Sequence, residues 1–387
     1  MKNVGMRLFI AVVLIGGLLF IGFIALIAAS LGVGAKFYSP FVQIVTLALI
    51  VFVMVGASIA PKLKKLLIAF GIFLLICTVT VVSYEVTMNY HKSIPVVNEQ
   101  GVNLGAYRPF GENTLAVRLD EKSTLKIESD IPIMDGATAL YPLYSAFAQA
   151  TYPEKVYKID DSEVQCNTTT EAYDNLFSGR VDVIFVAQPS KEQMEVAKAA
   201  NLDLQLTPIG KEAFVFFVNT KNPVSEITTE QIQSIYSGKI TNWKEIGGNN
   251  ESIRAFQRPD NSGSQTMLQK LMDGKNLMTP PKEDVVEGMG GIIEQTASYR
   301  NYKNAIGYSF LFFATQMVKD DKIKLLKVDG VYPDRDTIKS KKYPLSADFY
   351  AVTVGKKRSP NVERLIEWIL SPQGQYIVEK TGYTPLN

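Results

Sequence analysis

Three long runs without a charged residue, all near the N-terminus, constrain this chain more than any other feature. They cover residues 8–35, 37–61 and 66–84 and consist mainly of Leu, Ile, Val, Phe, Ala and Gly. About 20 apolar residues suffice for a helix to cross a bilayer. A cleaved signal peptide followed by two buried core helices fits less well, because the first run is too long for the apolar part of such a peptide. The sequence therefore predicts three membrane-spanning helices.

The basic residues beside these runs predict the orientation of the spans. Six of them flank the runs: Lys2, Arg7, Lys36, Lys62, Lys64 and Lys65. Two precede the first span, one separates the first span from the second, and three separate the second from the third. Because cytoplasmic loops are enriched in Lys and Arg, the N-terminus and the second loop are expected in the cytoplasm. The chain is then a multi-pass protein of the cell membrane, with residues 88–387 outside the cell.

The composition of residues 88–387 is that of an ordinary soluble domain. Residues 1–87 hold six of the 40 Lys and Arg residues and one of the 38 Asp and Glu residues, so the rest of the chain is slightly acidic. A nucleic-acid-binding protein would show a basic stripe instead. One His and two Cys residues cannot build a Cys/His zinc site or a His-based triad. We expect neither an enzyme nor a bound metal or cofactor.

Beyond residue 130, short apolar runs alternate with longer segments of helical periodicity. Strands are expected near 131–134, 181–186, 214–218, 253–256 and 306–308, and helices near 138–150, 170–179, 190–200, 228–237, 263–272, 290–300, 360–370 and 373–380. Strands that alternate with helices predict an α/β fold with mainly parallel sheets. About 260 residues of this pattern exceed a typical single core, so two lobes are expected.

The sequence divides into an anchor, a tether and a two-lobed domain. The anchor covers residues 1–87, the juxtamembrane tether 88–128 and the domain 129–387. Gly, Pro and short apolar pieces in the tether favour packing against the domain over a free linker. The polar stretch 219–223 is the best candidate for a crossover between the lobes. The first lobe then comprises about 129–218 together with C-terminal segments that return to it. The second lobe comprises about 219–315.

Two segments place small and polar residues where a strand gives way to a helix. Within residues 135–139 (DGATA), the Thr138 hydroxyl lies beside the unpaired amides of a helix N-terminus. Within residues 258–264 (RPDNSGS), Arg258 can reach a second helix N-terminus with a two-pronged guanidinium. Free amides, a helix dipole and an arginine together suit a tetrahedral oxyanion. The alternative for each segment alone is an ordinary helix cap, since Ser, Thr and Asp are common capping residues.

From about Ile131 to Asn387 the chain resembles the phosphate-binding receptors of ABC importers, which are two-lobed type II periplasmic binding proteins. The resemblance rests on the two segments above and on several further motifs. These are NPV at 222–224, TTEQI at 228–232, GKITNW at 238–243, IGG at 246–248, AIGY at 305–308 and YPLS at 343–346. The combination is specific, although each piece alone is weak.

The resemblance implies a set of ligand contacts. In the first lobe, Thr138 and the amide of Ala139 match phosphate-binding positions of the family. The family's other first-lobe hydroxyl aligns with residues 168–170, three threonines of which Thr169 is favoured. The second-lobe arginine and its Ser-Gly-Thr loop match Arg258, Ser262, Gly263 and Ser264, with Ser in place of Thr.

One position departs from the family pattern. After the strand at 181–186 the family usually places a carboxylate that accepts the proton of hydrogen phosphate, whereas this chain has Ala187 and Gln188 there. Asp182 comes too early in the strand to serve. A carboxylate would also repel fully deprotonated sulfate, so its absence affects the expected selectivity for phosphate over sulfate.

The leading interpretation is an extracellular, membrane-tethered binding protein for phosphate or a similar oxyanion. Its expected partners are that anion, the permease subunits of an ABC importer and the membrane, but no nucleic acid. The alternative is a sensory or regulatory module with the same fold whose ligand binding is altered or lost. The substituted position 187 and three spans where one anchor would suffice favour this alternative.

Overall fold

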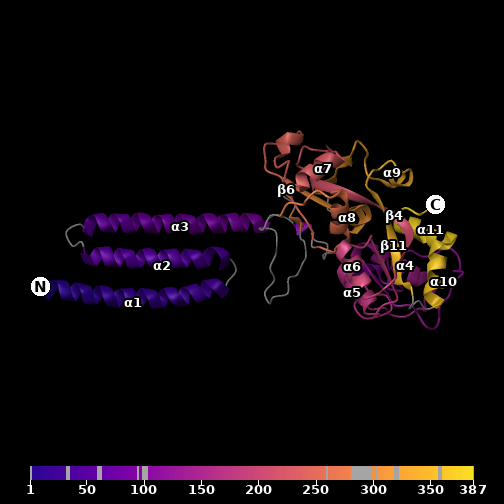
Figure 1. Cartoon of the computed structure of the whole chain (residues 1–387), viewed down its shortest axis with the longest axis horizontal. Coiled ribbons are helices and arrows are strands. Elements are labelled where there is room, and N and C mark those ends of the chain that lie inside the picture. The colour runs from indigo at the N-terminus through magenta and orange to yellow at the C-terminus, as the bar shows by residue number, and fades with distance from the viewer. Residues whose placement is uncertain are drawn as a thin grey trace. The chain divides into compact units, whose positions relative to one another are not determined.

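A computed structural model describes most of the chain, namely residues 2–31, 35–58, 63–93, 96–97, 103–258, 260–279, 299–300, 303–317, 322–355 and 360–386. Two compact units are distinguished, Met1–Ser93 and Ile94–Asn387. Figure 1 shows long helices in the first unit and a mixture of helices and strands in the second.

The first unit consists of three long helices: α1 (Lys2–Leu31), α2 (Ala35–Ser58) and α3 (Leu63–Ser93). Each contains a segment long and apolar enough to cross a membrane: Gly5–Ser30, Phe37–Ala57 and Lys64–Asn89. The three apolar helices expected from the sequence are therefore confirmed. Their large apolar side chains point outward, as in Phe9, Phe20 and Leu75, which are each more than 60% exposed.

Side-chain contacts join the second and third helices of this unit. The rings of Phe37 in α2 and Tyr84 in α3 stack with their centroids 3.8 Å apart. The neighbouring Tyr38 hydroxyl donates a hydrogen bond to Glu85, the only acidic residue of the unit. A carboxylate on an apolar helix is costly without such a partner, so this contact helps to fix how α2 and α3 pack.

A seven-stranded sheet forms the centre of the second unit (Figure 1). Its strand order is β2-β3-β11-β4-β8-β6, and β9 also pairs with β4. The strands are β2 (Met134–Gly136), β3 (Val183–Val186), β4 (Leu204–Asn219), β6 (Arg254–Ala255), β8 (Ala305–Phe310), β9 (Ile323–Leu325) and β11 (Ser346–Val354). Two short pairs lie outside it: β1 (Val96–Val97) with β7 (Tyr299–Arg300), and β5 (Glu226–Ile227) with β10 (Lys327–Val328).

The sheet is mixed, so the expectation of mainly parallel sheets is wrong. Strand β2 is parallel to β3, and β6 is parallel to β8. Strand β11 is antiparallel to both β3 and β4, and β4 is antiparallel to β8 and β9. The reason is that β11 comes from the C-terminal part of the chain and inserts between two strands that the sequence order would otherwise make neighbours.

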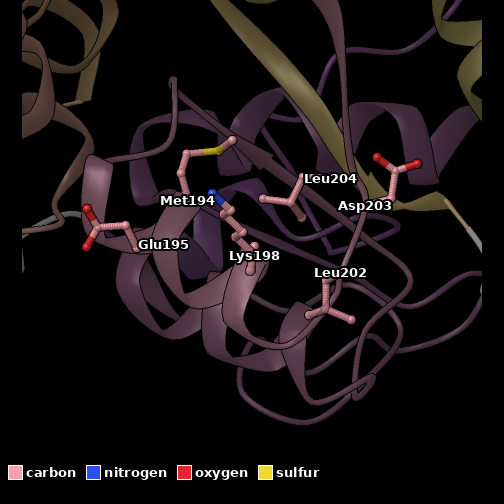
Figure 2. A pocket seen from close by; sticks show the side chains of 7 residues that line it. Met194, Glu195, Lys198, Leu202, Asp203 and Leu204 are labelled. Carbon is pink, nitrogen blue, oxygen red and sulfur yellow. The ribbon is translucent and has the colours of Figure 1, made fainter.

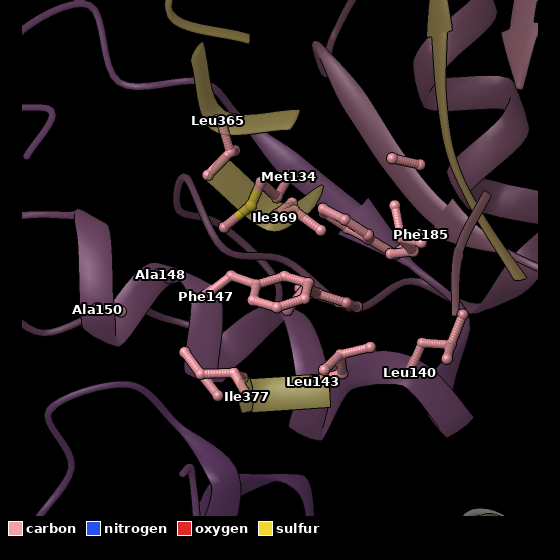
Figure 3. Packing of buried hydrophobic residues seen from close by; sticks show 14 of the residues in the cluster. Met134, Leu140, Leu143, Phe147, Ala148, Ala150, Phe185, Leu365, Ile369 and Ile377 are labelled. Carbon is pink, nitrogen blue, oxygen red and sulfur yellow. The ribbon is translucent and has the colours of Figure 1, made fainter. Parts of the chain in front are cut away.

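Strand β4 passes through both lobes and changes partners on the way. Residues 204–213 pair with β11, and residues 214–218 pair with β8. One core contains Phe147 and Phe185, and the other contains Trp243 and Tyr308. In Figure 3, β2, β3, α4 and the C-terminal helices surround the first core. The fold is thus α/β with two lobes that share β4.

The helices of the first lobe are α4 (Tyr141–Thr151), α5 (Thr168–Phe177), α6 (Lys191–Ala199), α10 (Pro360–Leu370) and α11 (Pro372–Thr381), and those of the second lobe are α7 (Thr229–Tyr236), α8 (Gly263–Leu271) and α9 (Arg335–Lys339). Shorter turns are η3 (Leu104–Tyr107), η4 (Thr138–Leu140), η5 (Trp243–Ile246) and the π-helical η7 (Phe313–Met317). Capping boxes begin α6 and α7, where Ser190 pairs with Gln193 and Thr228 with Gln231. Most of the helix expected near 290–300 lies outside the described residues.

The segment 103–128 packs against the first lobe. Its Phe110 amide donates to Gln149 of α4 over 2.9 Å, and its Thr124 amide donates to Gln373 of α11 over 2.9 Å. Leu125 and Ile127 are buried in the same core as α4. The domain limits at 87, 128 and 218 stay predictions. Because the cores divide β4 between Ile209 and Ala213, we propose that the lobes meet there, before residue 218.

Candidate functional site

The first-lobe loop begins where β2 ends. Gly136 is required there, because a Cβ atom at this position would lie 2.4 Å from the Phe185 carbonyl oxygen of β3. The chain then turns into η4, which carries Thr138 and Ala139, both half-buried. The Tyr383 hydroxyl donates to the Ala139 carbonyl, so the loop is fixed from the C-terminal end of the chain.

A buried carboxylate organises this loop from beneath. Asp135 is fully buried and accepts from the Asn167 amide at 2.9 Å, the Asn167 side chain at 3.0 Å and the Asn175 side chain at 2.8 Å. It also accepts from the Gly136 amide at 2.7 Å. These bonds hold the start of α5 beside the end of β2. Sequence reasoning gave Asp135 no role; an acid directly after apolar strand residues was the available signal.

The start of α5 combines a strained backbone with the absence of a side-chain cap. Thr168 has a φ of 68°, an unusual value for a β-branched residue, and the Asn167 side chain does not cap the helix. Thr169 is buried, whereas Thr168 and Thr170 are exposed. A strained residue at a helix N-terminus is frequently found at binding sites. Among the three threonines, Thr169 therefore has the position expected of a ligand contact.

Cys166 lies between the two first-lobe segments. Its thiol contacts the Thr138 hydroxyl and approaches the Gly136 carbonyl oxygen at 3.8 Å. Burial raises the pKa of the thiol to about 12, so it stays neutral. The neutral thiol thus links Thr138 to the start of α5 without adding a negative charge there.

The second-lobe loop leads from β6 into α8. Ser262 caps this helix by accepting from the Gln265 amide at 3.3 Å, and Gly263 and Ser264 are buried in its first turn. The Arg258 amide donates to Gln265 at 3.0 Å and to the Tyr308 hydroxyl at 2.9 Å. The backbone of Arg258 is thus fixed over the first turn of α8, and the Nε and Nη1 atoms of its guanidinium are shielded from solvent.

The two loops meet at Gly263. A Cβ atom added there would lie 3.3 Å from the Cβ of Ala187 and 3.6 Å from the Oγ1 of Thr169, both in the first lobe. The N-termini of α5 and α8 therefore converge, and each carries a partial positive charge from its helix dipole. Ala187 lies at this junction and brings no acidic group to it.

The chemistry of this junction is that of hydrogen-bond donation. It offers hydroxyl groups and first-turn amides, while the buried carboxylate of Asp135 beneath the first-lobe loop already accepts four hydrogen bonds. Among the described residues, no three His, Cys, Asp or Glu side chains gather as metal ligands would. The arrangement suits a small anion.

A separate surface hollow lies beside the C-terminal half of α6. Its volume is about 380 Å³, and Met194, Lys198 and Leu204 are among the residues that line it (Figure 2). None of the seven residues predicted to contact a ligand borders this hollow. It does not belong to the junction between α5 and α8.

Two of the proteins that this chain resembles in sequence are phosphate-binding proteins. The chain is 28% identical over 255 residues to the phosphate-binding protein PstS of Bacillus subtilis, covering 65% of this chain and 80% of that protein. It is 30% identical over 183 residues to PstS of Borreliella burgdorferi, covering 46% of this chain and 64% of that protein. The chain thus spans less than two thirds of the Borreliella relative.

A solved structure is also similar. It is a Clostridium perfringens protein with bound phosphate, assigned as a phosphate ABC transporter substrate-binding protein. It is 26% identical with a TM-score of 0.50, and the match covers 68% of this chain and all of that one. The family model of the PBP superfamily domain matches residues 131–373. Since that range is more than half of the chain and contains both loops of the junction, this protein belongs to the PBP superfamily.

Proposed function

We propose that residues 94–387 bind phosphate or a similar oxyanion outside the cell and present it to the permease of an ABC importer. The observation that carries this proposal is the close approach of the two lobes at Gly263, where an added Cβ atom would lie 3.6 Å from the Thr169 hydroxyl oxygen. Two helix N-termini that converge from separate lobes make a site that is complete only when the lobes are together. The phosphate-binding relatives favour phosphate as the anion.

The proposed ligand contacts are the residues that form or border this junction. They are Thr138, Ala139, Thr169, Arg258, Ser262, Gly263 and Ser264. Amides and hydroxyls would bond the anion's oxygens while the Arg258 guanidinium balances its charge. We assign no catalytic residue and no cofactor to this site.

Membrane tethering is part of the same proposal. The three apolar helices would anchor the chain through residues 8–35, 37–61 and 66–84, with the binding domain outside. A tethered receptor remains near the permease, which raises its effective concentration there.

The second candidate is a sensory or regulatory module whose ligand binding is altered or lost. The position of Ala187 favours it: a Cβ atom added at Gly263 would lie 3.3 Å from the Ala187 methyl group, where the family resemblance leads us to expect a proton acceptor. Such a module would retain a binding partner without binding phosphate.

A panel of oxyanions tests the proposal. The full chain in detergent is titrated calorimetrically with phosphate, sulfate and a larger organic phosphate at pH 6 and pH 8. Saturable binding of phosphate supports the transport receptor. If no anion binds while a membrane partner still co-purifies, the sensory module replaces it.

A further inference from the structure

The second-lobe ligand loop is joined to helix α6 of the first lobe through one residue, Asn261. The Ser190 hydroxyl donates to Asn261 Oδ1 at 2.7 Å, and Asn261 Nδ2 donates to Glu192 Oε2 at 2.7 Å. The Gln193 side chain donates to the Asn261 carbonyl oxygen at 3.2 Å. Asn261 therefore contacts α6 through its side-chain acceptor, its side-chain donor and its backbone.

The capping box of α6 is what makes these bonds available. Ser190 and Gln193 satisfy each other's backbone amides at 2.8 Å and 3.0 Å, which leaves the hydroxyl proton and the side-chain NH₂ unused within the helix. Both side chains are about 95% buried, so donors without partners would be costly. Asn261 supplies the two missing acceptors.

The backbone of Asn261 has the conformation that this contact needs. Its φ of 66° lies in the left-handed region, which Asn tolerates better than most residues. The turn directs the carbonyl oxygen and the side chain toward α6, while the next residues, Ser262 and Gly263, begin α8. A second bond between the lobes runs from Lys270 to Gln188 over 2.8 Å.

These contacts lie beside the ligand loop and depend on the position of the lobes. Continuous chain and the shared sheet join the lobes elsewhere, whereas the bonds to Asn261 must break when the lobes separate. An exposed polar contact alone would contribute little, whereas Ser190 and Gln193 are buried in this arrangement and depend on Asn261 for their acceptors.

We propose that Asn261, Ser190, Glu192 and Gln193 form an interlobe clasp that slows release of the bound anion. Asn261 is a positioning residue, since it acts on lobe closure rather than on the anion itself. The proposal rests on the oxyanion-binding function and adds the residues that set the lifetime of the complex. Because an open clasp does not obstruct the site, the clasp affects dissociation more than association.

Release of radiolabelled inorganic phosphate from the full chain in nanodiscs tests this inference. Asn261→Gly keeps the left-handed backbone and its carbonyl acceptor but removes both side-chain bonds. It should raise the dissociation rate about tenfold, as expected for two lost hydrogen bonds. The association rate should change less than about twofold. A dissociation rate within about twofold of wild type would overturn the clasp.

The chain offers a matched control and a rescue. Asn201 also has a positive φ, 51°, but lies exposed after α6 and away from α8, so Asn201→Gly should leave both rates unchanged. Asn261→Asp places a carboxylate against the carboxylate of Glu192. This variant should therefore release phosphate at least as fast as Asn261→Gly. Adding Glu192→Gln to Asn261→Asp restores a hydrogen bond in which residue 192 donates and residue 261 accepts. Release of phosphate should then slow again. Absence of this rescue would count against the pairing.

Hydrogen exchange separates failure of the clasp from failure of the proposed function. If wild type does not bind phosphate, the proposed function fails, but the amides of residues 190–194 can still be compared in the unliganded chain. Faster exchange of these amides in Asn261→Gly than in Asn201→Gly supports the clasp. Equal exchange in both variants overturns it.

Discussion

At the scale of single residues, the site depends on small side chains at the place where the lobes meet. A Cβ atom added at Gly263 would lie 3.3 Å from the Ala187 methyl group and 3.6 Å from the Thr169 hydroxyl oxygen, so a larger side chain would crowd this junction. Asp135 holds the Thr169 segment in place through three donors, two from Asn167 and one from Asn175. Both Asp135 and Glu192, which accepts from Asn261, are already engaged in hydrogen bonds.

The selectivity of the junction between anions follows from its excess of hydrogen-bond donors over free acceptors. A junction without a free carboxylate should not strongly reject sulfate, and Ala187→Asp should increase the preference for phosphate by adding a proton acceptor and a repulsive charge. Calorimetry with both anions on wild type and variant measures the difference. A wild-type preference for phosphate above about a thousandfold, roughly 4 kcal/mol, would show that another residue already supplies the acceptor.

Removing the buried carboxylate should weaken the first lobe. Asp135→Ala leaves the Asn167 and Asn175 donors without an acceptor, so the free energy of unfolding should fall by about 3 kcal/mol. Urea unfolding followed through Trp368 fluorescence measures this change. Asp174→Ala, a substitution of an acid on the exposed side of α5, is the control, and equal effects of both would refute the role of Asp135.

At the scale of elements, β4 determines how the lobes are joined. Glu212 lies on this strand beside the change of partners and is buried. Its carboxylate accepts from the Ala213 amide at 3.0 Å and from the Phe312 amide, which follows β8, at 3.3 Å. Burial raises the pKa of Glu212 to about 8, although these amides and the Arg335 charge oppose the shift.

This pKa predicts how stability changes with pH. The folded state holds the Glu212 proton up to about pH 8, whereas the unfolded state loses it near pH 4.5. The stabilisation is therefore complete below about pH 4.5 and is lost as pH rises toward 8, by at most about 1.4 kcal/mol per unit. Glu212→Gln should remove this slope, and the exposed Glu195→Gln should not. Urea unfolding at pH 5.5 and 8 compares them, and an unchanged slope would contradict the assignment.

Most helices could be predicted from sequence, because amphipathic periodicity and caps such as Ser190 and Thr228 act locally. The first half of β4 could not, since Pro208 and Gly210 are unfavourable in strands. There the pairing with β11 shifts register at Phe349, whose ring would lie 2.4 Å from a Cβ at Gly210. Tertiary packing, which overrides local propensity, creates this strand.

The candidate site residues also divide into those with a local sequence signal and those positioned by tertiary contacts. The loops containing Thr138 and Ser262 could be predicted, because small residues between a strand and a helix are a local signal. The preference for Thr169 among three threonines comes from the family resemblance and stays a prediction. The bonds of Asp135 and Asn261 join segments more than 30 residues apart. No local pattern encodes such contacts.

At the scale of the whole molecule, an apolar three-helix unit precedes a two-lobed binding domain. In the proposed topology, the charge asymmetry around the helices predicts that the domain lies outside the cell. Protease added to intact cells without an outer membrane should degrade residues 94–387, while lysis adds no further cleavage. Full protection before lysis, with cleavage afterwards, would show that the domain lies inside.

The central claim is that helix N-termini from both lobes and Arg258 form one anion site. Phosphate titration of the full chain, comparing wild type with Arg258→Ala, tests it most directly. Loss of a partly buried, charge-assisted bond should weaken binding by roughly 2–5 kcal/mol, while the exposed Arg180→Ala should bind like wild type. Phosphate affinity within about threefold of wild type in a folded Arg258→Ala protein would contradict the account.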